Sequence, residues 1–306
     1  MVNTKTLSVE ETNRALKRKR IKSAIWRYAA KVFVFVMLAL VYAPLIYITI
    51  YSFNDAKVMG AEGNVTFENY ALLFSGEDEG ALLLAAARNT AIVAITSAVI
   101  AVLLGTLGAI GIFYTRRKMW KNSMQFLNQI PIVNAEIVTA FSLMVFFISI
   151  LHVQMSLLTL IIGHVILALP YVVLSVLPKL EQMDPSLYEA AMDLGATQTR
   201  ALFKVVIPDI MPGILSGFLL SITLSLDDFV ITAFTKPANI IVMGEEEQFQ
   251  TISTFIDESI KRNSVPKEIR PFTAIMFGLI LLVMFGMYIK SVLDAKKERK
   301  ILKGEK

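Results

Sequence analysis

Two adjacent aspartates, Asp227 and Asp228, lie in the stretch LSLDDFVITAF, whose other side chains are apolar or hydroxylated. A third acid, Glu136, lies in another long apolar region. A charged side chain at the centre of a bilayer costs at least about 2.5–3.5 kcal/mol on the insertion scale, so we expect none of the three to face lipid. Carboxylates that face protein or a water-filled path could bind a cationic solute.

Three roles are open for these carboxylates. They could bind a cation in transit, pair with basic residues of a partner subunit, or be protonated and hydrogen-bonded to neighbours. No predicted span carries a Lys or Arg near its centre, which disfavours an ion pair within the chain but leaves one across a subunit interface open. Aromatic residues could contact methylene groups or make cation–π contacts, and those near the acids in sequence are Phe141, Tyr171 and Phe229.

The aspartates are predicted to lie on a single helix over residues 211–234. Four polar residues recur at positions i, i+4, i+7 and i+11, which places them on one face of that helix. These residues are Ser221, Ser225, Asp228 and Thr232. The small residues Gly213 and Gly217 extend the same stripe, and their spacing is typical of membrane helices that pack closely. The helix therefore presents hydroxyls and carboxylates beyond a closely packed end.

The elements that position these residues are membrane spans. The chain has 306 residues, 55% of them hydrophobic, and it contains apolar runs near 20 residues that soluble domains lack. Six segments are long enough to cross a hydrocarbon core of about 30 Å, which predicts an all-α, polytopic bundle of six transmembrane helices. They are residues 32–53, 90–114, two segments within 121–179 that divide near 152–154, 211–234 and 272–291.

The sequence offers no support for a metal site or for catalysis. The absence of cysteine excludes disulfides and thiolate metal sites. The two histidines, His152 and His164, are too far apart for a short-spacing zinc site, and His164 is interpreted as a packed or path-lining residue. No phosphate-binding G-x-x-x-x-G-K-[S/T] loop is present, so the chain is not predicted to be an ATPase or another enzyme, and we expect it to bind no cofactor.

Basic residues predict the orientation of the spans. Residues 1–31 carry nine Lys and Arg, and clusters follow the second span and the sixth span, whereas the first loop is mostly acidic. The loop over 236–270 also carries five basic residues, but loops of this length obey the rule less strictly. We therefore predict a cytoplasmic basic segment (1–31), a transmembrane domain (32–292) and a cytoplasmic basic tail (293–306). The clusters indicate topology and contact with lipid rather than binding of nucleic acid.

The cytoplasmic loop over residues 184–208 has strong helix signals. Asp184 is a predicted N-cap, Pro185 follows at the first helical position, and Gly195 suits a left-handed residue just past the helix end. Thr197 is predicted to cap a second short helix, which should stop before Pro208. An apolar stripe at i, i+3, i+4 and i+7 comprises Leu187, Ala190, Ala191 and Leu194.

The sequence of this loop resembles the EAA motif of permeases from ATP-binding-cassette (ABC) importers. The pattern is EAA, then a glycine, then a hydrophobic-x-hydrophobic-Pro ending, which Val205-Val206-Ile207-Pro208 supplies here. The resemblance implies the type I importer (MetI-like) fold and a coupling helix seated on a cytoplasmic ATPase. The residues that it assigns to this contact are Glu189, Ala190, Ala191, Asp193, Gly195 and Pro208.

More narrowly, several stretches are similar to the spermidine/putrescine permeases of the PotC type. They include YSFN (51–54), TFENYALLF (66–74), RNTAIVA (88–94), AEIVTAFSLMVFF (135–147) and LSITLSLDDFVITAFTKP (220–237). Where that type commonly has Pro-Asp, this chain has Ala135-Glu136, so the acid is retained while a proline kink is lost or moved to Pro131.

The resemblance implies a bacterial inner-membrane subunit of an ATP-driven polyamine importer. Its expected partners are a second permease subunit in a heterodimer, two cytoplasmic ATPases that use the ATP, and an extracytoplasmic polyamine-binding protein. From the acids, the polar helix face and the nearby aromatic residues, we predict a substrate path that contains Asp227, Asp228, Glu136, Ser225, Ser221 and Tyr171. An ABC permease for another solute, such as a metal cation or an opine-like compound, is the alternative. A channel or carrier that works alone is disfavoured because the EAA loop has no purpose there.

Overall fold

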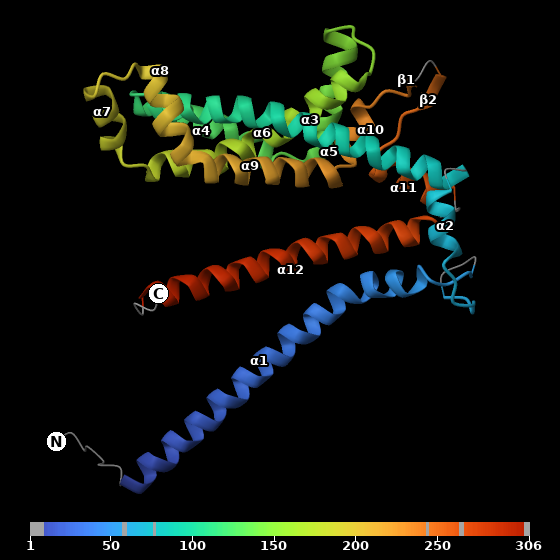
Figure 1. Cartoon of the computed structure of the whole chain (residues 1–306), viewed down its shortest axis with the longest axis horizontal. Coiled ribbons are helices and arrows are strands. Elements are labelled where there is room, and N and C mark those ends of the chain that lie inside the picture. The colour runs from blue at the N-terminus through green and yellow to red at the C-terminus, as the bar shows by residue number, and fades with distance from the viewer. Residues whose placement is uncertain (1–8, 57–59, 76–77, 243–244, 263–265, 303–306) are drawn as a thin grey trace, which may run out of the picture. The chain divides into compact units, whose positions relative to one another are not determined.

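The protein is described here from a computed structural model, which covers residues 9–302 apart from 57–59, 76–77, 243–244 and 263–265 (Figure 1). Residues 1–8 of the predicted N-terminal segment and 303–306 of the predicted tail therefore lie outside the described part. The fold is mostly helical, as predicted. One short hairpin is the exception, in which β1 (Asn239–Val242) pairs antiparallel with β2 (Glu245–Gln248), with Asn239 opposite Gln248.

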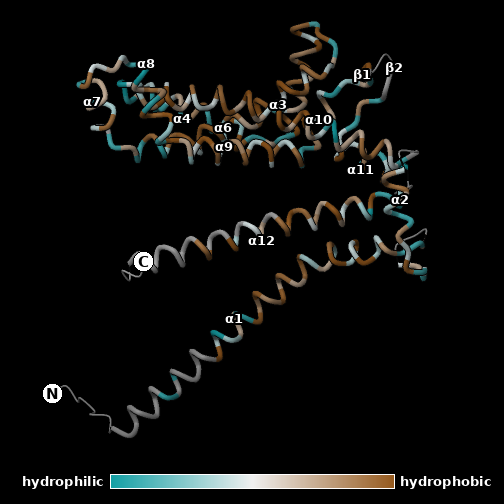
Figure 2. The backbone as a smooth tube through the Cα atoms, viewed as in Figure 1, coloured by the Kyte–Doolittle hydropathy of each residue, from teal (hydrophilic) through white to brown (hydrophobic). Residues whose placement is uncertain are grey.

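Five described helices are long and apolar enough to cross a membrane, and a bent pair of helices makes a sixth span if it is counted as one. Figure 2 shows hydrophobic residues along most of their length. The five spans are residues 25–51, 79–114, 157–182, 198–227 and 269–286. The predicted division near 152–154 is confirmed, since a loop separates residue 150 from the helix that begins at Leu157.

The third predicted span is a bent pair of helices, and its break follows Pro131, one of the two outcomes predicted for the proline kink. α4 (Lys118–Val133) and α5 (Glu136–Val145) meet at an angle of 100°, and a π-helical turn (Phe146–Ile150) follows. Pro131 lacks an N–H group and lies in the last turn of α4, and the backbone then becomes extended at Asn134 and Ala135. The break places Glu136 at the first position of a new helix.

The chain divides into two compact units, of which the first contains residues 1–76 and 267–306. It holds α1 (Val9–Tyr51), α2 (Glu68–Phe74) and α12 (Ile269–Leu302). α1 begins well before the predicted first span, so the described part of the basic segment, residues 9–31, forms one helix with the span. Within this unit, the rings of Tyr42 and Phe277 pack 6.4 Å apart, and the buried Arg270 donates a hydrogen bond of 2.9 Å to the carbonyl of Ala56.

The second unit, residues 77–266, is built around three packed helices. They are α3 (Asp78–Tyr114), α6 (Leu157–Gln182) and α9 (Ile207–Asp227), and α11 (Ile252–Lys261) contacts α3. The close packing predicted for Gly213 and Gly217 is confirmed. A Cβ on Gly213 would lie 2.9 Å from the carbonyl oxygen of Ser175, and one on Gly217 would lie 3.3 Å from Val172. These small residues let α9 approach α6.

The loop between α6 and α9 contains α7 (Pro185–Asp193), α8 (Gln198–Ala201) and a π-helical turn (Leu202–Val206). The prediction that the second short helix stops before Pro208 was wrong, because the chain stays helical through the π turn into α9. Pro208 lies in the first turn of α9, where its missing N–H costs little, and the wider turn before it makes room for the proline ring.

Candidate functional site

Three of the predicted path acids lie in one cavity of about 460 Å³ within the second unit. Glu136, Asp227, Asp228 and Tyr171 all line it, together with Phe229 and residues of α4, α5 and α6. Among the described residues, no Lys or Arg lines this cavity. The structure therefore brings together carboxylates from segments far apart in the sequence, with no Lys or Arg among the described residues that line the cavity.

The predicted continuous helix over 211–234 was wrong, because α9 ends at Asp227 and α10 (Val230–Thr235) begins two residues after Asp228. Asp228 has an extended backbone (φ −63°, ψ 124°). Its carboxylate accepts hydrogen bonds from the backbone N–H groups of Ile231 (3.1 Å) and Thr232 (2.8 Å) and from the Thr232 hydroxyl (2.8 Å). An acid thus satisfies free N–H groups at the start of α10, which favours the break over a continuous helix.

Sequence reasoning missed this capping role of Asp228. The available signal was an aspartate just before a short apolar run, which is typical of a helix start. That signal was outweighed by the apolar length of the segment, which favoured one long span. Two other predicted path residues, Ser221 and Ser225, share a helix with Asp227 but do not line the cavity. Both side chains are buried.

The other two acids are more available than Asp228. Asp227 is exposed and has no hydrogen-bond or ion-pair partner among the described residues. Glu136 is also exposed, and it lines the same cavity as Asp227 and Asp228. The N-terminus of α5 favours an acid at Glu136, because free N–H groups give this end of a helix partial positive charge. Clustered carboxylates of this kind favour a cation between them.

Aromatic side chains near the acids divide into two groups. Tyr171 and Phe229 line the cavity, where a ring face could contact a cation or its methylene groups. Phe141 does not line it; its ring packs edge-to-face against Phe234, with centroids 6.3 Å apart. The suggestion that Phe141 contacts a solute therefore has no support from the cavity lining.

Behind the cavity, buried polar side chains form a connected network. The imidazole Nδ1 of His164 lies 2.8 Å from the Ser225 hydroxyl, and its Nε2 lies 3.0 Å from the Thr232 hydroxyl. Ser97 donates to Ser225 over 3.4 Å. His164 is buried at 1% exposure, which agrees with its interpretation as a packed residue. No cluster of three or more potential metal ligands occurs in the described part of the chain.

The loop over residues 184–208, which we call the coupling loop, forms its caps as predicted. Asp184 accepts the backbone N–H of Ser186 over 2.9 Å, and this hydrogen bond lowers the pKa of the Asp184 carboxyl. Gly195 has a φ of +84°, which is the left-handed conformation that favours glycine. Thr197 accepts the N–H of Arg200 over 3.4 Å at the start of α8.

The apolar stripe of α7 faces outward from the second unit. Leu194 is 89% exposed and Leu187 is 47% exposed. Ala190 is exposed as well, and the charged residues Glu189 and Asp193 lie on the same short helix with exposed side chains. Pro208 is exposed but belongs to α9 rather than to this helix. An exposed apolar stripe beside two acids is suited to contact with another protein.

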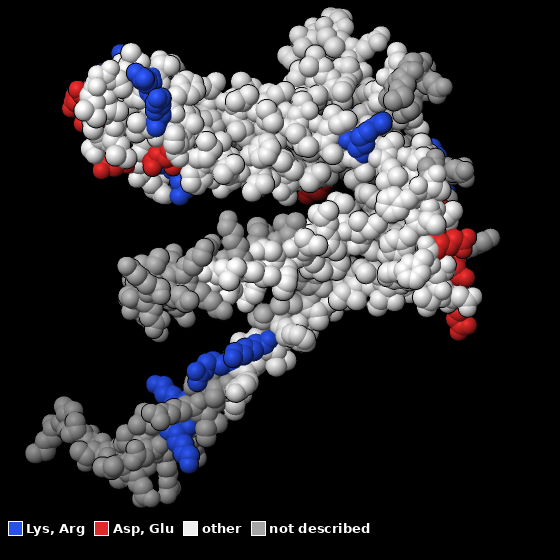
Figure 3. Space-filling model, viewed as in Figure 1, with Lys and Arg blue, Asp and Glu red and all other residues white. Residues whose placement is uncertain are grey.

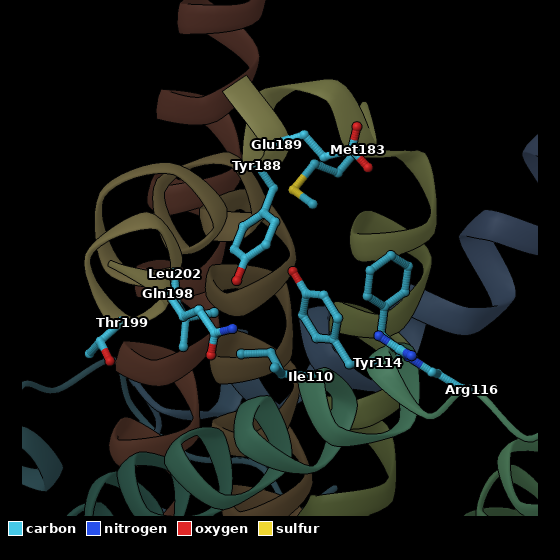
Figure 4. A pocket seen from close by; sticks show the side chains of 10 residues that line it. Ile110, Tyr114, Arg116, Met183, Tyr188, Glu189, Gln198, Thr199 and Leu202 are labelled. Atoms are coloured by element: carbon cyan, nitrogen blue, oxygen red, sulfur yellow. The ribbon is translucent and has the colours of Figure 1, made fainter. Parts of the chain in front are cut away.

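A second cavity of about 720 Å³ lies between this loop and the ends of α3 and α6 (Figure 4). The hydroxyl ends of Tyr114 and Tyr188 point toward one another there, and their ring centroids are 5.9 Å apart. Met183 and Glu189 line the same cavity. This tyrosine contact packs α7 against the end of α3. The apolar stripe of α7 remains exposed.

Comparison with known proteins agrees with these features. A model of the family described as "Binding-protein-dependent transport system inner membrane component" matches residues 101–299. The putrescine transport system permease protein PotI of Escherichia coli K12 is 29% identical over 266 residues, which cover 85% of this chain and 90% of PotI. The spermidine/putrescine permease PotC of the same strain is 31% identical over 264 residues, covering 86% of this chain and 92% of PotC.

Among solved structures, the chain resembles one from a bacterial ABC transporter involved in the import of the acidic polysaccharide alginate. The TM-score is 0.66 with 16% sequence identity, and the match covers 88% of this chain and 97% of that chain. At this identity the likeness concerns the fold. It confirms the predicted all-helical permease fold of an ABC importer.

Proposed function

The chain belongs to the family of inner membrane components of binding-protein-dependent transport systems, and we propose that its cargo is a polyamine such as spermidine or putrescine. As a multi-pass transport permease, it is not an enzyme. The observation that carries the proposal is the cavity in which Glu136, Asp227 and Asp228 converge without a lining Lys or Arg among the described residues.

The chemistry of a polyamine fits that cavity. Its ammonium groups require carboxylates, and its methylene chain favours apolar and aromatic walls. Glu136 and Asp227 supply exposed carboxylates from two different helices, while Tyr171 and Phe229 supply the rings. The names of the similar permeases PotI and PotC refer to the same class of solute.

ATP is used by a partner rather than by this chain. We infer that α7 seats on a cytoplasmic ATPase and that Glu189, Ala190, Ala191, Asp193 and Gly195 form or shape this contact. The exposed apolar stripe of α7 supports the inference. The complete importer then contains a second permease subunit, two ATPase subunits and an extracytoplasmic polyamine-binding protein.

Both termini are proposed to lie in the cytoplasm. On α1, the described basic side chains gather in the N-terminal part, whereas acidic side chains gather at the opposite end, near α2 (Figure 3). This asymmetry favours the basic end inside the cell. We propose the same side for the predicted tail (293–306), because it carries a basic cluster like that of the predicted segment 1–31, with residues 32–292 as the transmembrane domain between them.

Uptake of radiolabelled putrescine by the reconstituted complex tests the proposal. The ATPase, the second permease and the binding protein are included, and unlabelled solutes compete for uptake. We expect ATP-dependent uptake that spermidine inhibits and that divalent metal ions or opine-like compounds do not. Uptake that responds only to a metal ion or to another solute would overturn the assignment to polyamines.

A further inference from the structure

The break between α9 and α10 is fixed from several directions. The Asp228 carboxylate is held by Ile231 and Thr232, and its backbone carbonyl accepts a hydrogen bond of 2.8 Å from the hydroxyl of Ser253 in α11. The Thr232 hydroxyl also contacts His164, which lies on α6. Both sides of Asp228 are therefore tied to elements other than α9, and its conformation determines where the next residue back, Asp227, points.

We propose that His164 is a positioning residue for the cation cavity: through Thr232 it holds Asp228, and through Ser225 it holds the end of α9, so that Asp227 and Glu136 stay exposed to the cation. The proposal rests on the function proposed above. It divides the work among the three acids, with Asp228 as a helix cap and Asp227 and Glu136 as the groups that meet the cargo.

The surroundings of His164 suit this role. Ser225 and Thr232 carry hydroxyls that either donate or accept, so a neutral imidazole is satisfied at both nitrogens without a formal charge. Asp228 Oδ2 lies 3.6 Å from Nε2 and is the acidic group that faces the ring. Buried polar groups that are fully satisfied fix one arrangement of the helices around them.

Helix packing brings the helix that carries His164 close to α10. A Cβ on the neighbouring Gly163 would lie 2.7 Å from Ile231, so α6 and α10 touch closely at this level. This contact supports the hydrogen bond from His164 to Thr232 in fixing the start of α10.

Thr232→Val tests the proposal, because it removes the hydroxyl that links His164 to Asp228 while conserving the side-chain shape. Thr106→Val is the matched control, since the Thr106 hydroxyl is buried in α3 without a hydrogen-bond partner in the described structure. We expect Thr232→Val to raise the KM for putrescine about five- to tenfold, which corresponds to the net contribution of one typical hydrogen bond. Thr232→Ser should restore the wild-type KM, and Thr106→Val should leave it unchanged.

A double-mutant cycle separates positioning from general destabilisation. If Thr232 acts through Asp228, adding Thr232→Val to Asp228→Asn should raise the KM less than the product of the two single effects. Ser225→Ala, which removes the other contact of His164, should change KM in the same direction. A Thr232→Val complex with the same KM as Thr106→Val, or fully multiplicative effects in the cycle, would overturn the proposal.

Amide hydrogen exchange gives a readout that does not depend on the cargo. The amides of Ile231 and Thr232 should lose protection in Thr232→Val but not in Thr106→Val. If the wild-type complex takes up no polyamine, the proposed function fails while exchange still reports whether the network holds the cap. Unchanged protection in Thr232→Val would show that the network does not position Asp228.

Discussion

The coupling loop and the acid cavity are built in different ways. The loop is specified by residues that act on their immediate neighbours: Asp184 caps α7, Gly195 ends it, and Thr197 caps α8. The cavity depends on contacts between distant segments, since Glu136 and Asp227 meet there from separate helices. The loop exposes the apolar stripe to which we propose that another protein binds, whereas the cavity contains the carboxylates that we propose bind a solute.

The two regions should therefore respond differently to substitutions. A single backbone change in the loop should distort it locally, because its turns depend on Asp184, Gly195 and Thr197 acting on their immediate neighbours. The cavity should tolerate local changes that leave α6 and α9 packed, and it should fail when that packing or a cargo-facing charge is removed. The following substitutions separate these two kinds of dependence.

Leu194→Asp should have the largest effect on the loop. The side chain is 89% exposed, so the change should leave the fold intact while placing a charge on the apolar stripe. Loss of an apolar residue at the centre of an interface costs about 2 kcal/mol or more, which is roughly a thirtyfold weaker Kd for the ATPase. Binding of the purified ATPase to the permease checks this, with Leu194→Met as the control. An unchanged Kd would remove the stripe from the contact.

Gly195→Val should have the next largest effect, because it strains the backbone without adding a clash. A Cβ at Gly195 meets no atom within 4 Å, so the cost comes from the φ of +84°, about 1–3 kcal/mol for a β-branched residue. We expect lower ATPase affinity and lower uptake per ATP hydrolysed. Gly195→Asn should retain most of both, because asparagine tolerates this conformation. Equal behaviour of Val and Asn would show that backbone strain is not the cause.

Gly213→Ala tests the helix pair that connects the loop to the cavity. The added Cβ would lie 2.9 Å from a backbone oxygen of α6, so we expect a loss of about 1–3 kcal/mol in stability. Thermal unfolding in detergent measures it. Gly111→Ala is the control, since a Cβ there meets nothing within 4 Å. A Tm that falls equally in both variants would contradict close packing at Gly213.

Asp184→Ala should have the smallest effect. Because its pKa is lowered in the folded loop, the Asp184 cap contributes stability above its unfolded pKa of about 3.9, and this contribution is lost as pH falls through the folded value. The Ser186 amide should therefore exchange faster in Asp184→Ala at neutral pH. Asp184→Asn should keep the protection and remove its dependence on acidic pH. Equal exchange in the Ala variant and the wild type would argue against the cap.

The same contrast explains what the sequence could predict. The loop was predicted almost completely, because capping residues and a left-handed glycine act within a few positions of themselves. Its one error, the expected stop before Pro208, arose because a π turn absorbs the proline ring. Fold class and number of spans followed from apolar length, which requires no knowledge of how the helices pack.

The cavity was predicted only in part. Composition required Glu136, Asp227 and Asp228 to avoid lipid, and they share one cavity. The break at Asp228 was missed because its hydrogen bonds form only when α10 starts a new helix. The hydrogen bonds of His164 could not be predicted either, since this residue lies 61 residues from Ser225 and 68 from Thr232 in the sequence. Such contacts depend on tertiary packing that periodicity does not contain.

We propose that exposed carboxylates in the cavity recognise the cargo while the coupling loop engages the ATPase. Uptake and ATP hydrolysis measured together in the Asp227→Asn complex test it most directly. Removal of one cargo-facing charge should raise the KM for putrescine about tenfold or more, with ATPase affinity unchanged. An Asp227→Asn complex that retains the wild-type KM for putrescine would show that the Asp227 carboxylate does not recognise the cargo.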